Sequence, residues 1–190
     1  MHIHILGICG TFMGSLALLA REAGHIVTGA DQNVYPPMSD QLSDAGINIS
    51  SPYSADNIPR DTDLVMIGNA NLPRGNPAVE HVLEKNIPYT SGAEWLGRYL
   101  LHDKWVIAVA GTHGKTTTSS MLTVALQACG ADPSFAIGGT ISASGSNAHR
   151  GTGQYFVAEA DESDGSFIEY KPFGAIVTNV EHDHVDYFLR

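Results

Sequence analysis

The sequence predicts an α/β fold, with a Rossmann-like parallel-sheet domain followed by the first part of a P-loop NTPase-like domain. Short apolar segments alternate with stretches of helical spacing in the first half, which indicates a parallel sheet covered by helices on both faces. Two glycine-bearing turns, at 7–14 and 111–114, each separate a predicted strand from a predicted helix. A polar break at 102–104 precedes a new buried strand, so we place the domains at 1–102 and 103–190.

The elements of the first half follow from apolar periodicity and from helix stop signals. We expect strands at 2–6, 25–29 and 64–67. We expect helices at 15–23, at 77 to about 85, and at 92–101. Gly24 follows the first helix as a stop, and Pro77 suits the first turn of the second.

The second half repeats the strand–turn–helix pattern. We expect strands at 105–110, 155–158 and 175–178. A long helix is predicted at 116–129, and Gly130 closes it. This order places the second glycine turn at the start of the second domain.

The composition excludes some classes of partner. The net charge is −10, with 20 acidic against 10 basic residues, which argues against a nucleic-acid partner. No apolar run approaches the roughly 20 residues of a membrane span, and the N-terminus lacks signal-peptide features, so no membrane partner is expected. Cys9 and Cys129 are far apart in sequence and are interpreted as two reduced thiols of a cytoplasmic protein. The oligomeric state stays open.

The first glycine turn resembles a dinucleotide-binding turn but departs from it. Gly7 fits the first glycine position, and Asp31 supplies the acidic residue at the end of the second strand. Cys9 stands in the second glycine position and Gly10 comes one residue late, which weakens a nicotinamide interpretation. A tight turn without a ligand is the alternative. We favour a phosphate site, because free N–H groups of a helix N-terminus lie at 10–12.

The second glycine turn resembles a Walker loop. The pattern places its first glycine at Val109, and Gly111 supplies the early glycine instead. Gly111 and Gly114 let successive N–H groups face inward, and Lys115 can reach the outer phosphates of a nucleotide. The Thr116 hydroxyl can join a magnesium shell. The alternative is an ordinary turn with a surface lysine.

Carboxylates and histidines follow two later strands. The first group is Glu159, Asp161, Glu162 and Asp164. The second group is His182, Asp183, His184 and Asp186. The first group predicts a magnesium site at the carboxyl edge of the sheet, against the alternative of a solvated acidic loop. For the second group, zinc binding, helix capping and completion of the magnesium site all stay open.

Three motifs in this order carry a resemblance to the Mur ligase family. They are AGTHGKTTT, VAEADESDGSF and TNVEHDHVDYF. The segments GICGTFMG and DQNVYPPMSDQL are similar to the branch that joins a murein tripeptide to UDP-N-acetylmuramate. The resemblance spans essentially all 190 residues.

The resemblance implies an activity, substrates and a missing part. Members are cytoplasmic ATP-dependent ligases of peptidoglycan biosynthesis and recycling, which form an amide bond through an acyl-phosphate with ATP and Mg²⁺. The implied partners are UDP-N-acetylmuramate and the tripeptide L-alanyl-γ-D-glutamyl-meso-diaminopimelate. Members have three domains, and we expect this chain to be a fragment, inactive alone, with only the first domain and the opening part of the second.

Three alternatives to this activity stay open. They are a UDP-N-acetylmuramate–L-alanine ligase, a non-catalytic UDP-sugar-binding module, and a nicotinamide-dependent oxidoreductase. The first turn would serve the last of these, but the departure at Cys9 and the Lys115 loop speak against it.

The resemblance also assigns residues. The implied catalytic residues are Lys115, Glu159 and His184, and the implied metal ligands are Thr116, Glu159 and His184. The implied ATP-binding residues are Gly111, Thr112, His113, Gly114, Lys115, Thr116 and Thr117. The implied UDP-substrate residues are Gly10, Thr11, Phe12, Met13, Asp31, Asn69, Ala70 and Asn71.

Overall fold

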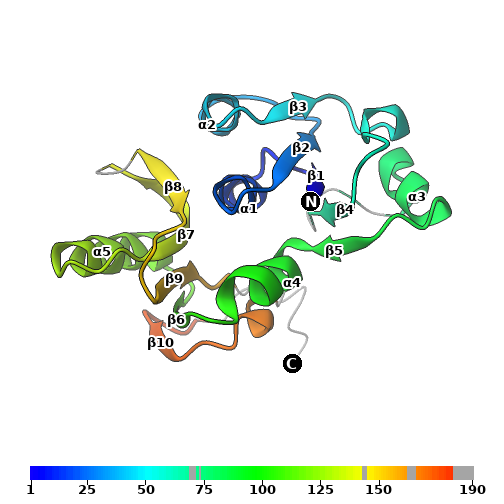
Figure 1. Cartoon of the computed structure of the whole chain (residues 1–190). Coiled ribbons are helices and arrows are strands. Elements are labelled where there is room, and N and C mark those ends of the chain that lie inside the picture. Colours follow the sequence, from blue (N-terminus) through cyan, green and yellow to red (C-terminus); the bar gives the residue numbers. More distant parts are fainter. Residues whose placement is uncertain (69–71, 73, 143–144, 162–165, 182–190) are drawn as a thin grey trace. The chain divides into compact units, whose positions relative to one another are not determined.

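The structure, a computed structural model, describes residues 1–68, 72, 74–142, 145–161 and 166–181. The chain divides into two compact units, Met1–Gly92 and Ala93–Arg190. Each unit is built around its own five-stranded sheet (Figure 1). The division falls before the boundary placed at 102–103, which stays a prediction.

The sheet of the first unit is parallel throughout, as predicted. Its strands are β1 (His2–Leu6), β2 (Ile26–Ala30), β3 (Asn48–Ser50), β4 (Leu64–Ile67) and β5 (Tyr89–Ser91). They lie in the order β3-β2-β1-β4-β5. The helical segments are α1 (Thr11–Glu22), α2 (Met38–Asp44), η1 (Ala55–Asn57) and α3 (Pro77–Glu84). The direction of the strand order reverses between β1 and β4. Sheets of this type bind their ligands beside the carboxyl ends of the strands at such a reversal.

Strand β1 is buried from end to end because helices cover both faces of a parallel sheet. Ile3, Ile5 and Leu6 have no exposed surface. The polar members of β1 are paired instead: His2 Nε2 and His4 Nδ1 each lie 2.9 Å from the Thr28 hydroxyl oxygen on β2. Burial, and then the neighbouring His2, lowers the pKa of His4 to about 4. The first glycine turn is therefore carried by a strand with a buried neutral histidine.

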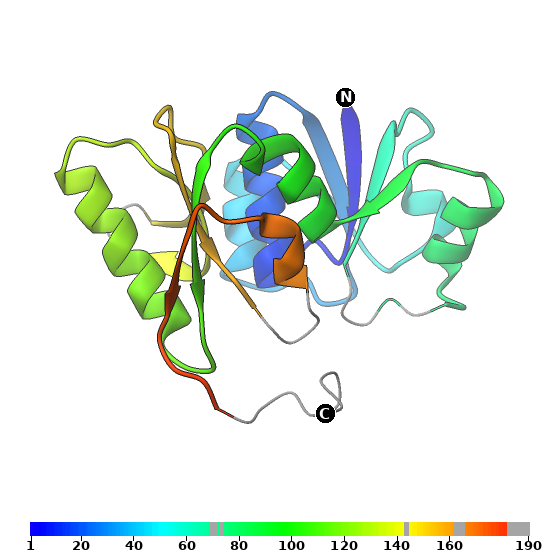
Figure 2. The ribbon, with the colours of Figure 1, turned by 90° about the horizontal axis from the view of Figure 1, so that it is seen from below.

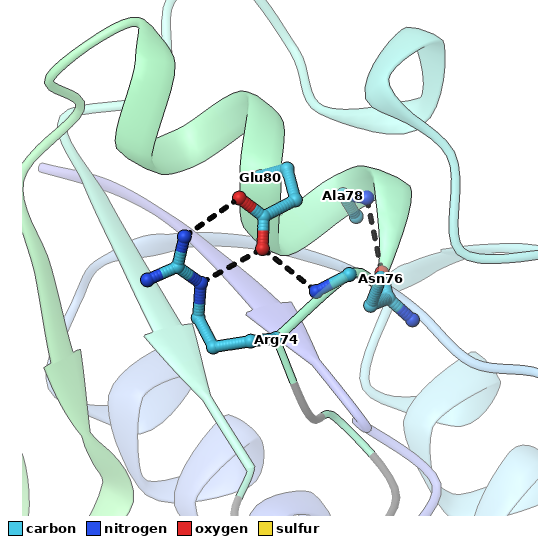
Figure 3. A network of polar contacts seen from close by, with 5 residues as sticks. Arg74, Asn76, Ala78 and Glu80 are labelled. Carbon is cyan, nitrogen blue, oxygen red and sulfur yellow. Dashed lines mark hydrogen bonds and ion pairs between the residues drawn. The ribbon is translucent and has the colours of Figure 1, made fainter.

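Helix α3 begins at Pro77 as predicted, and a polar network fixes this start (Figure 3). The Arg74 guanidinium donates two hydrogen bonds to the Glu80 carboxylate, at 2.8 and 3.0 Å, and the Gly75 N–H donates a third at 2.7 Å. The Asn76 side chain accepts from the Ala78 N–H at 3.0 Å and caps the helix. The bonds from Arg74 and then Gly75 lower the pKa of Glu80 to about 2.

The sheet of the second unit is mixed. Its strands are β6 (Trp105–Ala110), β7 (Ser134–Ile141), β8 (Ser146–His149), β9 (Tyr155–Glu159) and β10 (Gly174–Val177). They lie in the order β10-β6-β9-β7-β8, and only the β7–β8 pair is antiparallel. The helical segments are α4 (Gly92–Leu96), η2 (Gly97–Leu101), α5 (Lys115–Ala128) and η3 (Ser166–Tyr170). Helix α5 packs on β6, β7 and β9, and it can be followed beside these strands in Figure 2.

One predicted helix start is wrong, and one predicted helix keeps its bounds but changes type. Helix α1 begins at Thr11 and not at Ser15, because Gly14 belongs to the helix and not to the turn. A Cβ at Gly14 would lie 2.2 Å from the Met38 sulfur, so this glycine allows α1 and α2 to approach closely. The helix predicted at 92–101 is an α-helix only to Leu96 and continues in wider π-type turns.

Among the α-helices and strands that the structure describes, five have no clear signal in the sequence. They are α2, β3, β5, β7 and β8. Strands β3 and β5 have three residues each, too few to show alternation, and β7 contains two glycines. Among the described helices, none combines the length and the apolar character needed to cross a lipid bilayer.

Candidate functional site

The first glycine turn joins β1 to the N-terminus of α1. Gly7 has φ of +83°, and its N–H donates to the Ala30 carbonyl of β2 at 2.9 Å. Gly10 is the N-cap of α1 and offers no capping side chain to the N–H groups of the first helical turn. Thr11 is exposed, whereas the side chain of Met13 is buried. A ligand at this turn could therefore contact the backbone of Met13 but not its buried side chain.

Asp31 anchors this turn. It is 6% exposed, and its Oδ2 accepts a hydrogen bond from the Cys9 N–H at 2.8 Å. Its Oδ1 accepts from the Asn33 N–H at 3.0 Å and from the Tyr53 hydroxyl at 3.2 Å. Burial and then the Asp31 charge raise the pKa of Tyr53 to about 12. The structure thus brings Asp31 and the first turn together, with the carboxylate already bonded by protein donors.

The other residues assigned to the UDP substrate have different outcomes. Gly10, Thr11 and Phe12 lie at the start of α1, beside the turn that Asp31 holds. Asn69, Ala70 and Asn71 lie outside the described residues.

Burial, and then Asp31, raises the pKa of Cys9 to about 11, so its thiol is neutral near pH 7 and is a weak nucleophile.

The second glycine turn joins β6 to the N-terminus of α5. Gly111 has φ of +130° and Gly114 has φ of +80°, so two left-handed residues make the curl. A Cβ at Gly111 would lie 2.2 Å from the Thr178 hydroxyl oxygen, so the position also lacks room for a side chain. Lys115 opens α5, and its Nζ donates to the Gly111 carbonyl at 2.8 Å. The ammonium group therefore folds back over its own loop.

Two residues after β10 hold this second turn by the backbone of His113. The His113 N–H donates to Asn179 Oδ1 at 3.1 Å, and its carbonyl accepts from Asn179 Nδ2 at 3.1 Å. The Thr178 hydroxyl also donates to the His113 carbonyl, at 2.6 Å. The imidazole is exposed, with Nε2 3.8 Å from a Glu181 carboxylate oxygen.

An open pocket of about 190 Å³ lies beside the second turn, at the carboxyl ends of β6, β9 and β10. It is lined by Ala110, Gly111, Thr112, Ala160, Phe167, Val177, Asn179, Val180 and Glu181. Parallel α/β sheets place their ligands at this edge. Thr112 faces this pocket from the loop, while Thr116 and Thr117 belong to the first turn of α5.

Thr116 and Glu159 meet at the start of α5. The Thr116 hydroxyl donates to Glu159 Oε1 at 3.0 Å, and the Gly138 N–H of β7 donates to Glu159 Oε2 at 2.7 Å. A hydroxyl and a carboxylate at this spacing are oxygen donors of the kind that Mg²⁺ prefers. Lys115 precedes Thr116 in the same helical turn, so an ammonium group and two oxygen-bearing side chains lie at one helix end.

Not every predicted ligand can be placed. His184 lies outside the described residues, as do Glu162, Asp164, His182, Asp183 and Asp186. Within the part of the chain that the structure describes, no group of three or more His, Cys, Asp or Glu side chains could hold a metal ion. Sequence reasoning missed Gly138, Tyr53, Thr178 and Asn179. Their contacts depend on strands that meet only in the folded sheet.

Comparison with known proteins identifies the family of this chain. The model of the Mur ligase family, catalytic domain, matches residues 2–104, and the model of the Mur ligase middle domain matches residues 109–190. The chain belongs to the Mur ligase family. The family resemblance read from the three sequence motifs is thus confirmed.

Individual Mur ligases match along nearly the whole chain. The UDP-N-acetylmuramate–L-alanyl-γ-D-glutamyl-meso-2,6-diaminoheptandioate ligase of Escherichia coli is 54% identical over 99% of this chain. The UDP-N-acetylmuramate–L-alanine ligase of Syntrophomonas wolfei is 41% identical over 98%. The chain spans 42% and 39% of the lengths of these two proteins. A crystal structure of a ligase of the first kind, from Neisseria meningitides, is 43% identical, with a TM-score of 0.91, over 98% of this chain and 63% of that chain.

Proposed function

We propose that the full-length protein is an ATP-dependent ligase that joins L-alanyl-γ-D-glutamyl-meso-diaminopimelate to UDP-N-acetylmuramate, in peptidoglycan recycling. The pairing of Thr116 with Glu159 at 3.0 Å, next to Lys115 at the start of α5, carries this proposal. The 54% identity to the Escherichia coli ligase supports the choice of substrate. The proposed site of action is the cytoplasm.

The second turn would bind ATP. Lys115 would leave the Gly111 carbonyl and place its ammonium group on the outer phosphates, while the N–H groups of the loop cradle them. The γ-phosphoryl group would pass to the muramoyl carboxylate, giving ADP and an acyl-phosphate. The amine of the tripeptide would then attack the acyl carbon, and inorganic phosphate would leave. This chemistry needs mainly positioning and neutralisation of charge.

Thr116 and Glu159 would hold a magnesium ion, with His184 as the third protein ligand. Bound there, the ion would neutralise charge on the outer phosphates. Both described residues fit this task, because each directs an oxygen into the same space beside the phosphate loop.

The first turn would bind the UDP part of the substrate. The N–H groups of residues 11–13 would contact the pyrophosphate, and Asp31 would lie near the uridine. The Gly10 N–H donates to the Gly7 carbonyl at 3.1 Å, so Gly10 would approach the pyrophosphate without donating to it. Residues 69–71, after β4, would add a second contact. The reversal of strand order at β1 and β4 supports this location, because the loops after these strands diverge there.

An assay of the full-length protein tests the proposal. UDP-N-acetylmuramate, ATP and Mg²⁺ are supplied with either the tripeptide or free L-alanine, and product and ADP are measured. We expect ligation of the tripeptide with one ADP formed per amide bond. Ligation of L-alanine alone would favour the second candidate, which the 41% identical Syntrophomonas wolfei ligase represents. We expect this chain alone to bind the UDP-sugar without ligating it, and ligation by the chain alone would contradict this expectation.

A further inference from the structure

The regular pairing of strand β7 with its neighbours is interrupted close to the Thr116–Glu159 pair. It pairs with β9 in register from Ser134 to Ala136, and its register with β8 shifts between Ala136 and Ile141. Gly138 and Gly139 lie within this irregular stretch. Of these two glycines, Gly138 contacts the pair through its backbone, because its N–H donates to Glu159 Oε2 at 2.7 Å.

Both glycines leave room that a side chain would fill. A Cβ at Gly138 would lie 3.0 Å from each oxygen of the Glu159 carboxylate and 3.2 Å from its carbon. A Cβ at Gly139 would lie 2.9 Å from the Thr116 methyl group. One glycine therefore borders each member of the pair. The carboxylate is held from two sides, by the Thr116 hydroxyl on Oε1 and by the Gly138 amide on Oε2.

We propose that Gly138 and Gly139 are positioning residues for the magnesium site, and that they form its third side, opposite the start of α5. The Gly138 amide fixes Oε2 and so orients Oε1 toward Thr116, and Gly139 provides the space that the Thr116 side chain needs to point its hydroxyl the same way. Residues that orient metal ligands in this manner typically change metal affinity by about 10- to 100-fold when they are altered. This inference rests on the proposed function.

The test compares alanine variants of the full-length protein. Calorimetry measures binding of a non-hydrolysable ATP analogue across a Mg²⁺ titration, and UDP-N-acetylmuramate binding reports an intact first unit. We expect Gly138→Ala to raise the Mg²⁺ concentration for half-maximal binding roughly tenfold. Gly174→Ala is the matched control on β10, because a Cβ there would meet nothing within 4 Å. A Gly138→Ala value within about twofold of wild type would overturn the proposal.

A second pair of variants keeps the test decisive if Gly138→Ala does not fold. Gly139→Ala should raise the Mg²⁺ requirement, and adding Thr116→Ser, which removes the methyl group and keeps the hydroxyl, should return it to the value of Thr116→Ser alone. Gly139→Ala without effect, or an effect that Thr116→Ser does not relieve, would overturn the proposal. Wild-type protein that binds the nucleotide without any Mg²⁺ dependence would instead contradict the proposed function itself.

Discussion

The two glycine turns occupy the same place in their sheets but are held by groups of different charge. Each follows a parallel strand, β1 or β6, and opens a helix. The first is anchored by the buried carboxylate of Asp31, from the neighbouring strand β2. The second is anchored by the neutral side chains of Thr178 and Asn179, from the end of the neighbouring strand β10.

This difference in charge indicates which ligand each turn would bind more favourably. A triphosphate carries more negative charge than the esterified pyrophosphate of a UDP-sugar, so it gains more from a nearby cation and loses more from a nearby carboxylate. The second turn contains Lys115, while Asp31 lies against the first. The contrast therefore supports ATP at the second turn and the UDP-sugar at the first.

Removing the cation of the second turn gives the largest expected effect. Lys115→Ala in the full-length protein should lower kcat for ligation by on the order of 100- to 1,000-fold, because the outer phosphates lose their mobile charge partner. UDP-N-acetylmuramate binding should be unchanged. Steady-state kinetics and calorimetry check this, with Lys85→Ala on the surface of the first unit as the control. Near-normal turnover of Lys115→Ala would contradict the role of the second turn.

Acid should weaken the unit that carries the first turn. The folded-state pKa of His4 lies at about 4, below its ordinary value of 6.5, so between these values the unfolded chain binds a proton that the folded chain does not. The free energy of unfolding should be highest above pH 6.5 and should fall by up to about 3 kcal/mol as the pH drops to 4.

Urea denaturation followed by circular dichroism at several pH values measures this loss. His4→Asn can keep the bond to Thr28 and should flatten the profile over this pH range. His102→Asn, at an exposed position, should leave the profile as in wild type. Equal slopes for wild type and His4→Asn would rule out His4 as the cause.

Disturbing the anchor of the first turn should affect one ligand and not the other. In Asp31→Asn, an amide NH₂ group faces at least one of the donors from Cys9, Asn33 and Tyr53. We expect a loss of about 2 kcal/mol in stability and a weakened affinity for UDP-N-acetylmuramate, with the KM for ATP unchanged. Thermal melting and calorimetry measure the two effects, and Asp44→Asn on the exposed side of α2 is the control. If Asp31→Asn raised the KM for UDP-N-acetylmuramate and the KM for ATP equally, the two turns would not bind different nucleotides.

The smallest effect is expected at the anchor of the second turn. Thr178→Val removes the hydroxyl that donates to the His113 carbonyl at 2.6 Å, and Asn179 still holds the same carbonyl. The loss of one such bond, about 1 kcal/mol, should raise the KM for ATP about fivefold. Thr178→Ser keeps the hydroxyl and should behave as wild type. A Thr178→Val enzyme with an unchanged KM for ATP would show that this bond does not shape the loop.

The sequence predicts the strands that carry the turns because each segment, HIHIL for β1 and WVIAVA for β6, is rich in apolar residues and runs directly into a glycine turn. The bounds of β1, β4 and β6 match the predicted ranges, and α5 begins one residue before its predicted start. The short strands and the glycine-bearing β7 lack this signal. The sequence also places Asp31 at the end of its strand. It does not reveal that Cys9 and Tyr53 bind Asp31, because each of these contacts joins residues 22 apart. The bond from Thr178 to His113 spans 65 residues and arises only when β10 pairs with β6.

We propose above that each turn binds a different nucleotide, with ATP at the second turn and the UDP-sugar at the first. This division can be seen in a crystal of the full-length protein soaked with UDP-N-acetylmuramate, Mg²⁺ and a non-hydrolysable ATP analogue. We expect the triphosphate at the curl between Gly111 and Gly114 with Lys115 on its outer phosphates, and the UDP pyrophosphate at the start of α1. A triphosphate bound at the first turn, or a second turn that keeps Lys115 on the Gly111 carbonyl with ATP bound elsewhere, would contradict it.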